Sequence, residues 1–130
     1  MRLRDTYYRV WSAHYGSDTP SFHVELLPGC DVYRGHFPGH PVCPGVCNIG
    51  MLKECMEEAV GVKLAIETIK QCRMTAVASP EICSELDIRM HIQSLGEARW
   101  AVQAKLYDAE RTYMEYKGEM KREDGGASEP

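Results

Sequence analysis

The 130-residue sequence lacks any apolar run approaching ~18 residues, so no segment is expected to span a membrane. It also lacks a basic excess, because 15 Lys and Arg stand against 19 Asp and Glu and give a net charge of −4. Nucleic-acid binding draws on clustered cations, so no nucleic-acid partner is expected. The first residues carry two arginines but no apolar segment follows them, which predicts no secretory signal and a cytoplasmic location.

Spacings typical of metal ligands are missing as well. His14, His23 and His91 fall on the polar phase of predicted strands without a His-x-His or Cys-x-x-Cys pattern, so no metal site is expected. Without an export signal, the six cysteines are interpreted as reduced thiols. Cys43 and Cys47 lie near a predicted helix start, where a thiol can be activated, but burial as a small apolar residue is the preferred interpretation of Cys47.

The composition is that of one globular domain, with 44% apolar and 26% charged residues. We expect a single domain over residues 1–122. Residues 123–130 show no hydrophobic period and are expected to form a disordered tail.

Period-two alternation predicts the strands. The clearest three segments follow one another through short turns and predict an antiparallel meander. Three earlier segments alternate less cleanly, and the last of them breaks its alternation near Thr68, where we expect a β-bulge. The six predicted strands are, in chain order, 7–14, 22–27, 64–74, 86–92, 100–106 and 114–120.

One segment has helical character. It begins at Pro44 or Gly45, runs to about Val60 and is expected to end at Gly61 as a C-cap. Its first half is almost entirely apolar, which predicts burial on all sides. Its second half carries a stripe that we expect to face water, made of Lys53, Glu54, Glu57 and Glu58. The predicted class is α+β, with an antiparallel sheet of about six strands wrapped around one central helix.

The loop before this helix carries the chemistry. Residues 35–46 contain three prolines and three glycines, which make the segment stiff and able to hold His36 in one place. The free N–H groups near Gly45 and Val46, at the positive end of the helix dipole, suit a carbonyl that gains negative charge. An imidazole with a near-neutral pKa can remove a proton beside that carbonyl. Together these residues predict proton abstraction α to a thioester.

Residues 36–46 read HFPGHPVCPGV, and this string resembles the signature of the hot-dog-fold 3-hydroxyacyl-[acyl-carrier-protein] dehydratases of fatty-acid synthesis. The resemblance covers about residues 5–122. It implies a homodimer or larger even oligomer, an acyl chain along the dimer interface, and a phosphopantetheine arm entering between subunits. It also implies that His36 is the base, that Phe37 belongs to the substrate-binding motif, and that Gly45 lends its N–H to the thioester carbonyl.

The resemblance fails at one position. In that family a carboxylate on the partner's helix, five residues after the glycine, handles the leaving hydroxyl, but here the count arrives at Gly50. Glu54, one turn further along, is a candidate to reach back as the acid, although a solvated role is the preferred interpretation. Asn48 points elsewhere and is interpreted as a buried, hydrogen-bonded structural residue.

Three functions remain open. The first is a 3-hydroxyacyl thioester dehydratase in fatty-acid, lipid or polyene synthesis, acting on a carrier protein or coenzyme A. The second is an acyl-thioester-binding protein without turnover, and the third is an acyl thioesterase. No cofactor is expected, because in the dehydration the thioester is itself the electron sink. Met51, Met56 and Met74 are candidates either to line an acyl tunnel or to pack in the core. An acidic carrier protein would need a basic patch, for which Arg34, Arg73, Arg89 and Arg99 are candidates.

Overall fold

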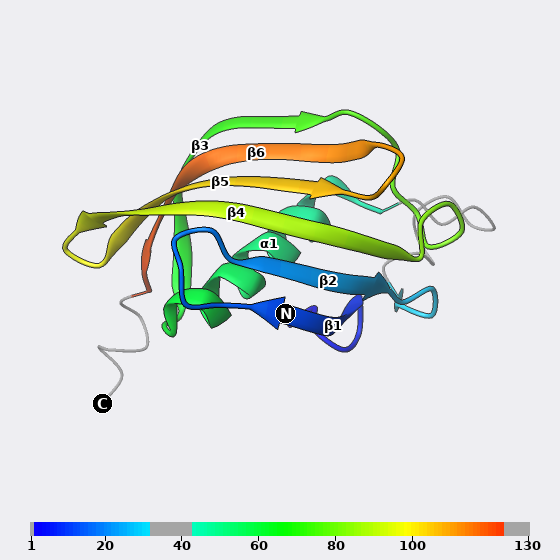
Figure 1. Ribbon diagram of the computed structural model, residues 1–130, viewed down its shortest axis with the longest axis horizontal. Helices are drawn as coiled ribbons and strands as arrows, with labels where there is room; N and C mark the ends of the chain where they lie inside the picture. Colours follow the sequence, from blue (N-terminus) through cyan, green and yellow to red (C-terminus); the bar gives the residue numbers. More distant parts are fainter. Residues whose placement is uncertain (1, 32–42, 124–130) are drawn as a thin grey trace.

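The computed structural model describes residues 2–31 and 43–123, and these form one antiparallel sheet curved around a helix (Figure 1). Within the described residues the sheet has six strands in the order β1-β2-β4-β5-β6-β3. The elements are β1 (Tyr8–His14), β2 (Ser21–Leu26), α1 (Gly45–Val60), β3 (Leu64–Met74), β4 (Glu85–Gly96), β5 (Arg99–Tyr107) and β6 (Thr112–Arg122). The predicted α+β class and the predicted wrapping of strands around one helix are confirmed.

The predicted meander of the last three strands is also confirmed. Met90 of β4 pairs with Ala104 of β5, which pairs in turn with Tyr116 of β6, and all three are buried. The turn between β4 and β5 comes later than expected, because β4 continues to Gly96. Glu97 and Ala98 then make the turn with positive φ of 55° and 56°.

Strand β3 lies at one edge of the sheet and pairs only with β6. Its register shifts between Ile66 and Thr68, which confirms the predicted bulge, and shifts again between Ile69 and Gln71. Ile66 and Ile69 are exposed. An edge strand with exposed apolar side chains offers both unpaired backbone groups and a surface for another chain.

The helix buries one face only. The buried positions repeat at helical spacing and are Cys47, Asn48, Met51, Leu52, Cys55 and Met56. The prediction that the first half is buried on all sides is wrong, because Val46 is 76% exposed. A single sheet covers one side of a helix and leaves the other side open. The helix ends at Gly61 with φ 81°, as predicted for a left-handed C-cap.

Candidate functional site

In the first turn of α1, two backbone N–H groups have no acceptor among the described residues. Pro44 stands at the N-cap in an extended conformation, and no side chain caps the helix. The N–H groups of Cys47 and Asn48 donate to the Pro44 carbonyl over 3.0 and 3.1 Å. The N–H groups of Gly45 and Val46 find no acceptor among the described residues. Two aligned donors at the positive end of a helix can bind an oxygen that carries negative charge.

Met74, at the end of β3, lies against this helix start. A Cβ on Gly45 would come within 2.8 Å of the Met74 Cε atom. A larger residue at position 45 would therefore require the end of the Met74 side chain to move. Because Met74 is 50% exposed, it is free to adopt other rotamers. Met51 and Met56, in contrast, are completely buried in the core.

Position 50 is covered by the N-terminal segment of the same chain. A Cβ on Gly50 would lie 2.8 Å from the Leu3 Cδ1 atom. Leu3 itself is 7% exposed, so its side chain is part of the core. The resemblance of residues 36–46 predicts a carboxylate at position 50, and in this chain the side chain of Leu3 lies against that position.

Glu54 binds the same N-terminal segment. Its carboxylate accepts hydrogen bonds from the Leu3 N–H (2.7 Å), the Arg4 N–H (2.9 Å) and the Tyr8 hydroxyl (3.0 Å). Burial, together with the nearby Cys55 and Glu54, raises the pKa of Tyr8 far above its usual value, so the hydroxyl remains a donor. Both carboxylate oxygens of Glu54 are therefore engaged by the chain's own donors.

The neighbouring glutamates act in a similar way. The Leu64 N–H donates to Glu57 over 2.8 Å, and Glu58 pairs with Arg4 and accepts from the Tyr15 hydroxyl over 3.3 Å. The prediction of a stripe that simply faces water is wrong for these three carboxylates. They bind backbone and side-chain donors because the N-terminal segment and the start of β3 pack on this side of α1.

Asn48 has the structural role predicted for it. It is 4% exposed, and its Oδ1 atom accepts a hydrogen bond from the Tyr7 hydroxyl over 2.7 Å. Cys47 is also buried, and burial raises the pKa of its thiol. A raised pKa favours the neutral thiol, in agreement with the interpretation of Cys47 as a packing residue.

Exposed apolar side chains come from the elements that meet near the helix start. The Cys43 N–H donates to the Ala78 carbonyl over 2.9 Å, which joins the residues before α1 to the segment after β3. Val46 and Met74 are exposed, and so is Val77, one residue from that contact. An apolar surface beside free amides suits a ligand with a carbonyl and a hydrocarbon chain.

The predicted base lies outside the described residues. His36 and Phe37 belong to residues 32–42, as do His40 and Arg34, so the assignment of His36 remains a prediction. Within the described ranges no set of three or more His, Cys, Asp or Glu side chains is arranged to hold a metal ion. In the same ranges no helix has both the length and the apolar character that crossing a membrane requires.

Comparison with known proteins identifies the family. The model of the ApeI-like family, described as ApeI dehydratase, matches residues 13–114. The chain belongs to the ApeI-like family. This confirms the resemblance to the hot-dog dehydratases that residues 36–46 suggested, and it supports a dehydratase-like or thioesterase-like hot-dog protein. A search of curated proteins returns no match.

Solved structures with the same fold share little sequence with this chain. The dehydratase heterocomplex ApeI:P from Xenorhabdus doucetiae is 17% identical, with a TM-score of 0.69, over 88% of this chain and 97% of that one. The HP0420 homologue from Helicobacter felis is 13% identical, with a TM-score of 0.67, over 95% of this chain and 93% of that one. The E. coli PaaI protein is 9% identical, with a TM-score of 0.62, over 91% of this chain and 80% of that one. These likenesses confirm the hot-dog fold.

Sequence reasoning missed two residues that shape the site. Leu3 precedes the first strand and belongs to no periodic pattern, so its contact with Gly50 had no signal beyond its apolar character. Met74 is predicted either to line a tunnel or to pack in the core, and its position over Gly45 depends on how β3 ends. Both contacts join residues more than 25 positions apart, which local patterns do not report.

Proposed function

We propose that this chain binds an acyl thioester at the start of α1 and reversibly dehydrates its 3-hydroxyacyl group to the trans-2-enoyl form. The observation that carries the proposal is the helix start, where the N–H groups of Gly45 and Val46 have no acceptor in residues 2–31 or 43–123. Membership in a dehydratase family and the motif that leads into this helix support it.

The reaction requires a base, an oxyanion site and an acid. His36 takes the proton from C2 of the acyl group, and the electron pair moves toward the thioester carbonyl. The negative charge that develops on the carbonyl oxygen is stabilised by the N–H groups of Gly45 and Val46. The hydroxyl on C3 then leaves as water, and the electron pair forms the C2–C3 double bond. No cofactor is needed, because the thioester accepts the electron pair.

We propose that His36 also supplies the acid. Gly50 offers no proton, its surroundings are filled by Leu3, and the Glu54 carboxylate is held by three donors. The proton that His36 takes from C2 is the one that the leaving hydroxyl needs, so transfer from the imidazolium balances the reaction. Removing a general acid–base group typically costs ~10²- to 10⁴-fold in rate.

The proposed form is a dimer or larger even oligomer, joined through the β3 edge. Support comes from the exposed Ile66 and Ile69 on this edge strand. Since one similar structure is a dehydratase heterocomplex, the second subunit need not be a copy of this chain. The proposed substrate carrier is an acyl carrier protein or coenzyme A in the cytoplasm, in fatty-acid, lipid or polyene synthesis.

A second candidate function is binding of the acyl thioester without turnover. The packing of Leu3 against Gly50 favours it, because the usual carboxylate position is closed by the chain itself. Thioester hydrolysis receives no such support, since it would also need a carboxylate to direct water.

The test is an assay of the purified protein with a 3-hydroxyacyl pantetheine thioester. Formation of the conjugated enoyl product is followed by absorbance, and release of free thiol reports hydrolysis. We expect enoyl formation that falls by ~10²- to 10⁴-fold in His36→Ala. His40→Ala, in the same loop, is the matched control and should retain the rate. Equal rates in the parent and His36→Ala would refute the assignment of the base. An inert parent that still binds the thioester would favour the second candidate.

A further inference from the structure

The outer face of the sheet, on the side away from α1, carries a hollow of about 520 Å³. Side chains alternate between the two faces of β4. Ile88 and Met90 face the core, so Arg89 and His91 face outward. We call this site the basic hollow. Its outward side chains come from four adjacent strands and include Gln71, Arg89, His91, Gln103, Lys105 and Lys117.

Three permanent cations meet there. Arg89 of β4 lies directly opposite Lys105 of β5 in the strand register. Lys117 of β6 pairs with Gln103, two residues along β5 from Lys105. Like charges directly opposite each other on one face of a sheet destabilise the fold. Lys105 also lies opposite Glu115 of β6, whereas Arg89 and Lys117 have no carboxylate opposite them on either neighbouring strand.

The fold does not neutralise these cations. None of the three forms an ion pair with a carboxylate anywhere in residues 2–31 or 43–123. The carboxylate that lines the basic hollow, Glu115, is paired with Arg73 at 3.7 Å. Lys105 lies 5.7 Å from the centre of the Tyr107 ring, a contact that leaves its charge in place.

Other cations on the sheet have carboxylate partners. Lys70 pairs with Glu119 at 3.1 Å, and Arg99 binds both Glu67 at 2.9 Å and Glu119 at 3.2 Å. Of the four arginines predicted as candidates for a basic patch, Arg73 and Arg99 have carboxylate partners, and Arg34 lies outside the described residues. Arg89 keeps its charge and has two lysines beside it.

The shape of the site favours a polypeptide over a small ligand. A second hollow of about 330 Å³ shares His91, Gln103 and Lys117 with the first, so the two form one elongated depression. Its floor at Met90, Ala104 and Tyr116 is buried, and the half-buried Tyr107 ring beside it has the Lys105 ammonium 5.7 Å from its centre. Long charged and amide side chains around such a depression suit a chain of carboxylates.

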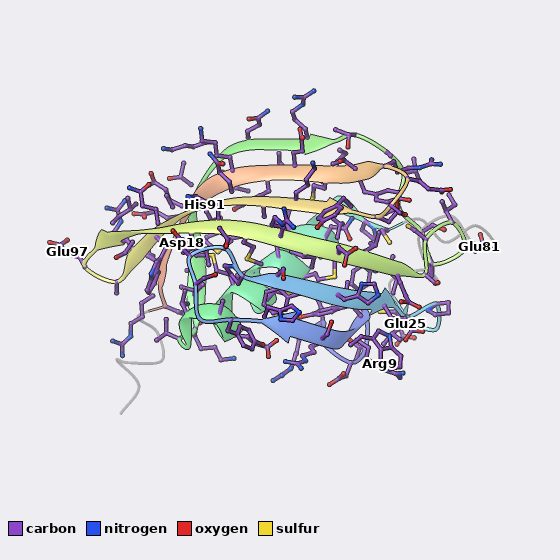
Figure 2. The ribbon with its side chains drawn as sticks, viewed as in Figure 1. Arg9, Asp18, Glu25, Glu81, His91 and Glu97 are labelled. Atoms are coloured by element: carbon purple, nitrogen blue, oxygen red, sulfur yellow. The ribbon has the colours of Figure 1, made fainter. Side chains whose placement is uncertain are left out.

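We propose that the basic hollow docks an acidic segment of a partner protein. The net charge of the chain is −4, so the hollow is a local positive region on a negative protein and gives the encounter a preferred orientation. Figure 2 shows His91 between Glu97 and Glu81, which lie at opposite ends of the view, while the label of Asp18 stands close to that of His91. This inference does not depend on the proposed thioester chemistry, which takes place at the start of α1.

The test measures binding of a fluorescent deca-glutamate peptide by anisotropy at low ionic strength. We expect saturable binding that weakens as salt is added, and a loss of about tenfold or more in Arg89→Gln/Lys105→Gln/Lys117→Gln. The matched control changes the same number of cations elsewhere, as Lys53→Gln/Lys63→Gln/Lys121→Gln. This control removes the same number of positive charges but leaves the basic hollow intact, so it should retain affinity within about twofold.

A stability measurement separates a docking site from ordinary surface charge. Because Arg89 and Lys105 repel each other, Arg89→Gln should keep or raise the melting temperature while it weakens peptide binding. Equal binding by the hollow variant and the control would overturn the proposal. So would displacement of the peptide by tripolyphosphate at equal charge concentration, or tighter binding of a ten-nucleotide single strand, which would indicate a small anion or a nucleic acid.

Discussion

The two halves of α1 differ in what their polar groups bind. At its start, the N–H groups of Gly45 and Val46 have no acceptor among the described residues, and Val46 is exposed. Further along, Glu54 and Glu58 bind the N-terminal segment, and Glu57 binds the start of β3. Polar groups that find partners within the chain stabilise it, whereas groups without partners remain for a ligand. The comparison therefore assigns stability to the second half and binding to the first.

The largest expected effect on stability is at Glu54. Glu54→Ala removes the acceptor of three hydrogen bonds and leaves the completely buried Tyr8 side chain without it, so the free energy of unfolding should fall by about 2–3 kcal/mol. Urea unfolding measures this loss. Glu54→Gln keeps one acceptor oxygen and should lose less. If Glu54→Gln folds normally but loses all enoyl formation, the second half of α1 also takes part in the chemistry. The assignment of that half to stability alone would then be wrong.

The next effect concerns the contact between position 50 and Leu3. Gly50→Glu gains helix propensity of roughly 1 kcal/mol but forces Leu3 to move, at a cost of about 1–3 kcal/mol. We expect a net loss of about 1 kcal/mol, measured by urea unfolding. In a Leu3→Ala background the same change should instead stabilise the helix. Equal effects in both backgrounds would show that Leu3 does not occupy this space.

The sequence predicted the strands and the helix ends, but not the contacts between distant segments. Alternation predicted the late strands because each has one face on the core, and Pro44 and Gly61 marked the helix ends through their backbone preferences. The partners of Glu54 and Glu57 were not predictable. Their donors are the backbone N–H groups of Leu3, Arg4 and Leu64, and a backbone donor leaves no mark in a side-chain pattern.

The carbonyl-binding role of Gly45 and Val46 stays a prediction from the motif before α1. Their N–H groups have no acceptor among the described residues, which agrees with such a role. The exposure of Val46 was missed, because an apolar residue in a helix is ordinarily assigned to the core. The place of His36 is still a prediction from the motif.

A smaller effect is expected at Met74, which lies over Gly45 in the first half. Its side chain is half exposed, so Met74→Ala should change unfolding free energy far less than the ~2–5 kcal/mol of a buried methionine. It should strengthen binding of an acyl pantetheine analogue several-fold, because Met74 no longer has to move. Calorimetric titration measures this, with the buried Met56→Leu as control. Unchanged affinity would separate Met74 from the binding site.

The smallest expected effect is on how stability depends on pH, and it arises at His23 of β2. Like the glutamates of α1, His23 binds partners within the chain. His23 bonds Asp87 over 2.8 Å and Glu85 over 2.6 Å, and these bonds raise its pKa above the usual 6.5. A raised folded-state pKa gives stabilisation that is complete below pH 6.5 and is lost as pH rises through the folded value. Partial exposure keeps it below about 1 kcal/mol. Melting temperatures at acid and alkaline pH should differ less in His23→Gln than in the parent, and an identical difference would refute this.

The central claim, that free amides at the start of α1 receive an acyl carbonyl, is tested most directly by a backbone NMR titration. The ligand is an acyl pantetheine in which an amide replaces the thioester, so that it binds without reacting. The account predicts saturable shifts of the Gly45 and Val46 N–H signals, while those of Lys105 and Lys117 on the outer face stay unchanged. Saturable binding that leaves Gly45 and Val46 unshifted would contradict it.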